Sequence, residues 1–264
     1  MTTYTTLELA VTPAGIATLW LNRPDKNNAF NGEMINELIE ALTVVAANEK
    51  VRLLLLRGHG KHFSAGADLA WMQVSANLDY AANLKDAHAL GELMECLYHL
   101  PCPTLAVVQG AAFGGAVGLV ACCDMAIGTP DAVFSLSEVR IGLVPAVISP
   151  YVVQAVGERA ARRYALSGER FNGERARELG LLCEAYPTDA LDAAVDEWAA
   201  MFLLNSPHAM RATKALLHGV GSGVLSEALR QRTESVIAGI RVSEEGQEGL
   251  KAFLEKRTPC WQEQ

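Results

Sequence analysis

The sequence predicts an α/β fold in which a strand-rich core is followed by a helical C-terminal third. Residues 51–56 are an apolar run apart from Arg52, which is typical of a strand buried on both faces of a parallel sheet. A helical pattern precedes this run, and the strand–helix–strand order implies a crossover connection. Beyond Pro150 helical patterns dominate. The 264 residues suffice for one large domain or for a domain with an appendage.

The N-terminal half alternates predicted strands and helices. Residues 6–11 and 16–21 alternate apolar and polar side chains, and the turn residues 12–15 between them predict a hairpin. Asn31 can cap a helix whose apolar residues keep helical spacing as far as Val45. The other elements predicted here are a helix over residues 79–100 and strands over 104–108, 125–127 and 133–136.

The C-terminal part is predicted to be almost entirely helical. Asn172 can cap one of its helices, and Ser206 with Pro207 can begin another, because proline is favoured at the first helical position. The predicted helices cover residues 158–166, 173–179, 190–204, 207–217, 224–240 and 244–256.

Charge and composition exclude several classes of protein. The net charge of −8 argues against a duplex nucleic-acid binder, which needs a basic face. No basic residue precedes Arg23, so we expect neither a secretory signal nor a transit peptide, and the apolar stretch 110–123 is too short to span a bilayer. The six cysteines form no C-x-x-C pair. We expect a cytoplasmic protein with reduced thiols that binds neither nucleic acid nor membrane.

Two glycine-bearing segments each follow a predicted buried strand and precede a predicted helix. The first covers residues 58–69, and the second runs from Gly110 to Gly118 and continues to Asp124. One backbone N–H group from each of two such loops is a standard way to build an oxyanion hole. A single glycine, such as Gly66 or Gly115, is better explained by a tight turn, but two such loops strengthen the functional interpretation.

Other chemistries have weaker support in the sequence. The glycine segments match no phosphate-binding motif, and no G-x-S-x-G elbow of a serine hydrolase is present. His59 and His62 are three residues apart, but no further ligand stands at metal-binding spacing, so we expect no metal. Glu138 is the most suggestive acid. Alone it would be an ordinary acid at the end of a strand, so its catalytic interpretation depends on the glycine segments.

Taken together, these residues resemble the crotonase superfamily, the enoyl-CoA hydratase/isomerase proteins. The matching segments are residues 22–24 with 28–30, then 63–69, 110–124, 138–145 and 248–257. The resemblance implies a spiral of β-β-α units. It assigns residues 1–195 to a core with a CoA-thioester site and residues 196–264 to a helical region that builds trimers, commonly stacked as hexamers.

The resemblance also implies the residues of the site. The backbone N–H groups of Ala67 and Gly115 would grip the thioester carbonyl of an acyl-CoA, and Glu138 matches the second of two glutamates that hydratases use to move the proton of a water. The implied CoA contacts are Lys26, Ala65, Asp68 and Leu69, with Phe253 and Lys256 reaching the CoA of a neighbouring subunit. Coenzyme A is then part of the substrate, and no separate cofactor is expected.

One residue departs from the family pattern. The first of the two glutamates falls on Gly118, which has no side chain. Gly114, Gly118 and Arg140 are expected to line the acyl pocket. Arg140 has two roles open to it, contact with a substrate carboxylate or an ion pair at the surface, and the ion pair is the simpler.

Three functions stay open. Residues 114–119, 137–143 and 145–150 resemble the bacterial 3-methylglutaconyl-CoA hydratases and their isoprenoid-chain relatives in leucine and acyclic-terpene catabolism. Their substrates carry a second carboxylate, which a glutamate at position 118 would repel. An enoyl-CoA isomerase would use one glutamate as a proton shuttle, and a third possibility is a non-catalytic CoA-thioester-binding protein. Hydration ranks first and isomerisation second.

Overall fold

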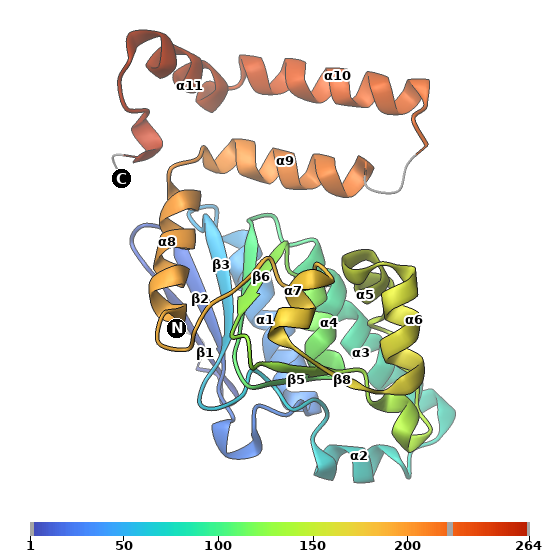
Figure 1. Cartoon of the computed structure of the whole chain (residues 1–264). Coiled ribbons are helices and arrows are strands. Elements are labelled where there is room, and N and C mark those ends of the chain that lie inside the picture. The colour runs from blue at the N-terminus through green and yellow to red at the C-terminus, as the bar shows by residue number, and fades with distance from the viewer. Residues whose placement is uncertain (1–2, 221–223, 263–264) are drawn as a thin grey trace.

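The computed structural model describes residues 3–220 and 224–262 and contains two sheets in that part of the chain (Figure 1). The larger sheet has the strand order β1-β2-β3-β4-β6-β9, and the smaller has the order β5-β7-β8. The strands are β1 Leu7–Val11, β2 Ile16–Leu21, β3 Leu53–Gly58, β4 Thr104–Val108, β5 Ala111–Phe113, β6 Met125–Gly128, β7 Val133–Ser135, β8 Arg170–Asn172 and β9 Glu184–Ala185.

The larger sheet is covered by helices on both faces. The hairpin β1–β2 is antiparallel, as predicted, and β2, β3, β4, β6 and β9 run parallel. Leu54 and Leu56 of β3 belong to the core with helices α1 (Gly32–Ala47) and α3 (Tyr80–Tyr98). Leu53 and Leu55 pack on the other face with residues of α8 (Leu191–Leu203). Figure 1 shows α8 beside the larger sheet. Burial on both faces explains the continuous apolar run of this strand.

The chain steps repeatedly from the larger sheet to the smaller one. Strand β4 leads into β5 and helix α4 (Gly115–Cys122), and β6 leads into β7 and the helices that follow it. This repetition of strand, strand and helix is the β-β-α spiral that the family resemblance implies. The remaining helices are α2 Leu69–Ser75, α5 Ser149–Val156, α6 Glu158–Ser167, α7 Gly173–Glu178, α9 Pro207–Val220, α10 Glu227–Val242 and α11 Glu244–Glu255, with short 3-10 turns η1 Pro24–Lys26, η2 Glu138–Ile141 and η3 Cys260–Gln262.

The predicted helix starts are confirmed where a capping side chain marks them. The Asn31 side chain accepts a hydrogen bond from Met34 N at 2.9 Å, and Asn172 accepts one from Arg175 N at the same distance. Ser206 Oγ accepts a hydrogen bond from Ala209 N at 3.0 Å and so begins α9. Each cap satisfies an N–H group that the first turn of a helix leaves without a partner.

Three local expectations were wrong. Strand β3 begins at Leu53 rather than at residue 51, because its partner β2 begins at Ile16 and the two strands pair from there. Residues 111–113 form strand β5 instead of a loop, because they pair with β7. Glu138 does not end a strand: β7 stops at Ser135, and Glu138 opens the turn η2.

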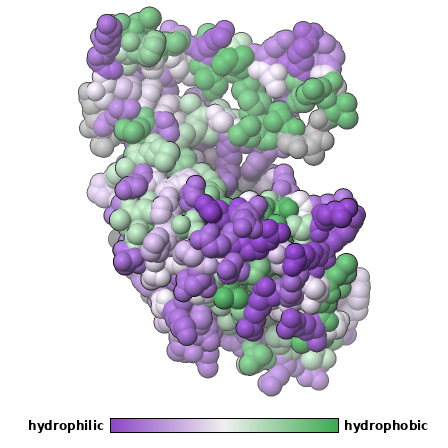
Figure 2. Space-filling view, viewed as in Figure 1, coloured by the Kyte–Doolittle hydropathy of each residue, from purple (hydrophilic) through white to green (hydrophobic). Residues whose placement is uncertain are grey.

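Helices α9–α11 form an arm at one end of the molecule, coloured orange to red in Figure 1. Lys214 of α9 ties this arm to the core: it is buried, pairs with Asp124 at 2.8 Å and donates to Cys102 O at 3.1 Å. Hydrophobic surface gathers on the arm in Figure 2. Its exposed apolar residues include Leu217, Ile237, Val242, Leu250, Phe253 and Leu254. No helix of the described chain has the length and apolar character needed to cross a bilayer.

Candidate functional site

The first glycine segment presents the backbone N–H group of Ala67. Phe30 N–H donates to Gly66 O at 2.7 Å, and Asp68 N–H donates to Phe30 O at 2.8 Å, so Phe30 and Ala67 face each other in a parallel bridge. In this pattern the N–H group of Ala67 points away from Phe30. It finds no acceptor within the described residues. Gly66 has φ +92°, and a side chain there would press on Phe113 O.

The second segment presents the N–H group of Gly115 in the same way. Gly114 N–H donates to Ser135 O at 2.9 Å, and Gly115 then begins α4. The first N–H groups of a helix have no partner inside it, and that of Gly115 has none elsewhere in residues 3–220 and 224–262. This group is therefore free to bind an oxyanion.

The register of the two segments brings these N–H groups together. Ser64 pairs with Ala112 in a second parallel bridge, and Ala67 and Gly115 each stand three residues beyond it. Phe30 confirms the proximity, because its backbone pairs with Ala67 while its ring atom Cε2 lies 3.4 Å from the Cβ position of Gly115. Two free donors thus converge from two loops, which is the arrangement that an oxyanion hole requires.

Glu138 lies beside this pair of donors. Its Oε1 is 3.0 Å from the position that a Cβ of Gly114 would take, and Gly114 has φ +53°, so only glycine allows this approach. Its Oε2 is buried without a hydrogen-bond partner in the described structure. Burial raises the pKa of this carboxyl, and a hydrogen bond from its own backbone N–H group offsets only part of that effect. A carboxyl whose pKa is raised holds its proton to a higher pH than a free one, which suits a group that must both give and take a proton.

Gly118 is buried one turn further along α4. The position where a Cβ would stand is taken by the side chain of Ile148, whose Cβ is 2.8 Å away, and Met94 Cε is 3.3 Å away. Aliphatic side chains therefore fill the space beside the position at which the family resemblance implies a second carboxylate.

The expected CoA contacts of the first half of the chain share one pocket of about 1070 Å³. Its lining includes Lys26, Ala65, Ala67, Asp68, Leu69 and Phe113. Asp68 uses its charge within the chain, because it caps α2 through Ala70 N at 2.8 Å and pairs with Arg23 at 3.0 Å. Burial acts to raise the pKa of Asp68, but its hydrogen bonds from Trp71 N, Arg23 and Ala70 N outweigh this and lower it.

The other predicted site residues do not line this pocket: they are Gly114, Gly115, Gly118, Glu138, Arg140, Phe253 and Lys256. Phe253, which is 81% exposed, and Lys256 belong to the distant arm, as Figure 1 shows. Arg140 is exposed, and its side chain lies against Gly168. The surface ion pair expected for Arg140 is missing from the described chain. This arginine therefore keeps a charge that no carboxylate of the described residues neutralises.

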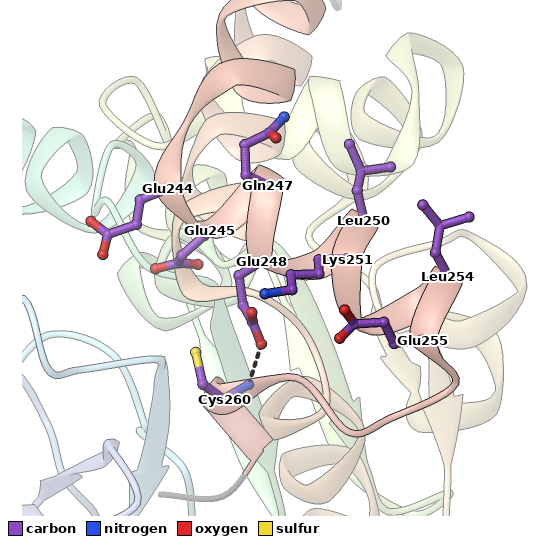
Figure 3. A pocket seen from close by; sticks show the side chains of 9 residues that line it. All are labelled: Glu244, Glu245, Gln247, Glu248, Leu250, Lys251, Leu254, Glu255 and Cys260. Atoms are coloured by element: carbon purple, nitrogen blue, oxygen red, sulfur yellow. Dashed lines mark hydrogen bonds between the residues drawn. The ribbon is translucent and has the colours of Figure 1, made fainter.

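A second hollow, of about 1000 Å³, lies on the arm rather than beside the glycine segments. Figure 3 shows its side chains, which come from α11 and from Cys260. Four of them are glutamates: Glu244, Glu245, Glu248 and Glu255. Glu248 accepts a hydrogen bond from Cys260 N at 3.0 Å and pairs with Arg257 at 2.7 Å. A lining with this many acids disfavours the phosphates of CoA.

His59 and His62 both make contacts within the fold. His62 Nδ1 accepts a hydrogen bond from Ala111 N at 3.0 Å, and His59 stacks on Trp20 with 4.3 Å between ring centroids. No group of three metal-ligating side chains occurs in the described ranges.

Two residues of the site were missed by sequence reasoning. Phe30 stands in one of the segments that resemble the family, which indicates a role in the site. The sequence does not indicate that Phe30 contacts both glycine-bearing loops. Ile148 stands in segment 145–150, which also resembles the family, but the sequence shows no sign of its contact with Gly118, because that contact depends on how α5 packs against α4.

Comparison with known proteins agrees with the geometry. A family model described as enoyl-CoA hydratase/isomerase matches residues 11–264. The structure of an enoyl-CoA hydratase from Shewanella pealeana is 49% identical, with 97% of this chain and 96% of that chain covered and a TM-score of 0.94. Pseudomonas aeruginosa AtuE is 37% identical, with 98% and 100% covered and a TM-score of 0.94.

Among curated proteins, 2,3-dehydroadipyl-CoA hydratase of Escherichia coli is 31% identical, with 91% of this chain and 92% of that protein covered. The match to the family model spans nearly the whole chain, and the solved relatives share its complete fold. The chain therefore belongs to the enoyl-CoA hydratase/isomerase family.

Proposed function

We propose that this protein is a cytoplasmic hydro-lyase that adds water to an α,β-unsaturated acyl-CoA, with Glu138 as its one proton-transferring carboxylate. The observation that carries the proposal is the buried, unpaired Oε2 of Glu138 beside the free N–H groups of Ala67 and Gly115. Coenzyme A enters as part of the substrate, through the pocket lined by Lys26 and Asp68.

In the proposed reaction the two N–H groups hold the thioester oxygen. The oxygen of a water molecule bonds to C3, and the electron pair of the C2–C3 double bond moves toward the thioester oxygen. There the two fixed N–H donors stabilise the negative charge without reorganising. One oxygen of Glu138 takes a proton from the water, and the carboxyl then delivers a proton to C2 as the electron pair returns. The sum is the addition of one water molecule.

The substrate that we propose is 3-methylglutaconyl-CoA or an isoprenoid-extended glutaconyl-CoA. Gly118 and Ile148 place no negative charge in the site, so the second carboxylate of such a substrate meets no repulsion there. Arg140, whose charge is unpaired within the described residues, is a candidate partner for that carboxylate.

The test compares 3-methylglutaconyl-CoA with crotonyl-CoA, which lacks the second carboxylate. We expect kcat/KM to favour 3-methylglutaconyl-CoA more than about tenfold, a difference of about 1.4 kcal/mol in transition-state binding. Equal or inverted rates for the two substrates would remove this choice of substrate.

Isomerisation of a 3-enoyl-CoA to a 2-enoyl-CoA is the second candidate function. The side chains of Ile148 and Met94 beside Gly118 favour isomerisation, because a reaction with one base needs no second acid. Incubation of a 3-enoyl-CoA in heavy water separates the two functions. An isomerase yields the 2-enoyl product without alcohol, whereas a hydratase leaves the 3-enoyl substrate unchanged.

We also propose that the protein assembles as a homotrimer or as a hexamer of two trimers. The exposed apolar residues of the arm support this, because the described residues of one chain leave Phe253, Leu250 and Leu254 largely uncovered. In the assembly Phe253 and Lys256 would reach the CoA of a neighbouring subunit. Light scattering of the purified protein measures the assembly, and a monomer at micromolar concentration would refute it.

A further inference from the structure

Ile148 stands at a junction of three helices beside the candidate site. It is 2% exposed and immediately precedes α5, and its side chain covers the α-carbon of Gly118 on α4. Met94 of α3 contacts the same point. Residues three apart on a helix lie on neighbouring parts of its surface, so Gly118 is about one turn further along α4 than Gly115, whose N–H group is one of the two donors. Ile148 therefore packs against the first two turns of the helix that supplies this donor.

Ile148 also lines a mostly apolar pocket of about 410 Å³. Its lining includes Val152 of α5 and Ala161 of α6, together with Leu136 and Pro145, and the ion-pairing side chains Glu158 and Arg162 also take part in it. Ile148 thus contacts Gly118 and lines this pocket as well.

We propose that Ile148 is a specificity-determining residue whose size limits the substituent that the acyl group can carry on its β-carbon. The inference rests on the proposed function, since it assumes that the thioester oxygen is held by Ala67 and Gly115. The β-carbon lies two bonds from the thioester carbonyl carbon, within reach of the side chain that covers Gly118. A β-methyl group fits against Ile148, and a longer branch needs the pocket that Ile148 lines.

The experiment measures binding of two saturated acyl-CoAs, so that no reaction is required. One is isovaleryl-CoA, which carries a methyl branch, and the other carries a six-carbon alkyl branch at the same carbon. Calorimetric titration gives both dissociation constants for the wild type and for Ile148→Ala. We expect the ratio of the constants to shift toward the long branch by about 10- to 200-fold, the range for added methylene groups in an apolar pocket.

Two further variants keep the test decisive. Ile148→Val removes one methylene group and should shift the ratio in the same direction by less, even where Ile148→Ala fails to fold. Ile127→Ala is the matched control, because Ile127 is equally buried but packs on the opposite face of the large sheet. In Ile127→Ala the ratio of the two dissociation constants should stay at the wild-type value.

The outcomes separate this inference from the proposed function. A shifted ratio in a protein that hydrates no enoyl-CoA supports the role of Ile148 and refutes hydration. An unchanged ratio in folded Ile148→Val and Ile148→Ala refutes the role of Ile148, whatever reaction the protein catalyses.

Discussion

Replacement of Gly118 by alanine tests how tightly α4 and α5 are packed. Alanine is favoured over glycine inside a helix by about 1 kcal/mol. At this position, however, the new Cβ would stand 2.8 Å from Ile148 Cβ and 3.3 Å from Met94 Cε. Overpacking of this kind costs about 1–3 kcal/mol. We therefore expect Gly118→Ala to lower the free energy of unfolding by about 1 kcal/mol, the balance of these two effects.

The cost of the same substitution should fall once Ile148 is shortened. Ile148→Ala alone should cost about 2–5 kcal/mol, because it leaves a cavity. In that background Cγ2 of residue 148 no longer meets the new Cβ, but Cβ of residue 148 still stands 2.8 Å away and Met94 Cε 3.3 Å away. We therefore expect Gly118→Ala to cost less than it does in the wild type, with a coupling of about 0.5–1 kcal/mol between the two substitutions.

Urea unfolding measures this double-mutant cycle on four proteins: the wild type, Gly118→Ala, Ile148→Ala and the variant with both substitutions. All four are compared at one fixed protomer concentration. The control is Gly239→Ala, because Gly239 lies inside α10 with no neighbour within 4 Å of its Cβ position. It should gain about 1 kcal/mol with either residue at position 148. Equal effects of Gly118→Ala in both backgrounds would show that Ile148 does not occupy this space, and would refute the packing that we describe.

Three other predictions concern charged groups. Glu138→Gln should lower kcat by about 10²–10⁴ with little change in acyl-CoA binding, and unchanged turnover would move the chemistry to another residue. Because burial raises the pKa of Glu138, its contribution to stability is complete below the unfolded pKa of about 4.5 and is lost as pH rises through the folded pKa. The free energy of unfolding in urea should therefore be larger for Glu138→Gln than for the wild type at neutral pH but not below pH 4.5. A difference between the two proteins that does not change with pH would contradict this. Lys214→Met should cost about 1–3 kcal/mol, because it removes the buried hydrogen bond to Cys102 O and the ion pair with the partly exposed Asp124, and a loss below about 1 kcal/mol in urea unfolding would argue against a buried anchor.

The elements that could be predicted are those whose signals are local. Helix α1 was predicted because Asn31 caps it and its apolar residues repeat at helical spacing, and β3 was predicted because burial on both faces leaves a continuous apolar run. Strands β8 and β9 and the short helix α2 were missed, because two to seven residues are too few to show a period.

The candidate site also has features that the sequence predicts and features that it does not. The glycine segments and Glu138 could be picked out because glycine at a strand-to-helix turn and a lone acid are visible in one stretch of sequence. The contacts of Phe30 with Gly115 and of Ile148 with Gly118 join segments that are distant in the chain. Such pairs depend on tertiary packing, and no periodicity of a single sequence reports them.

The bridge between Ser64 and Ala112 has a consequence for chain length. Only two residues separate Ser64 from Ala67, which is held by its own bridge to Phe30, and one of them is Gly66 with φ +92°. The loss of either residue would leave too short a connection for both bridges to form. The N–H group of Ala67 would then lose its place beside that of Gly115. A working donor pair therefore requires a fixed number of residues between Ser64 and Ala67.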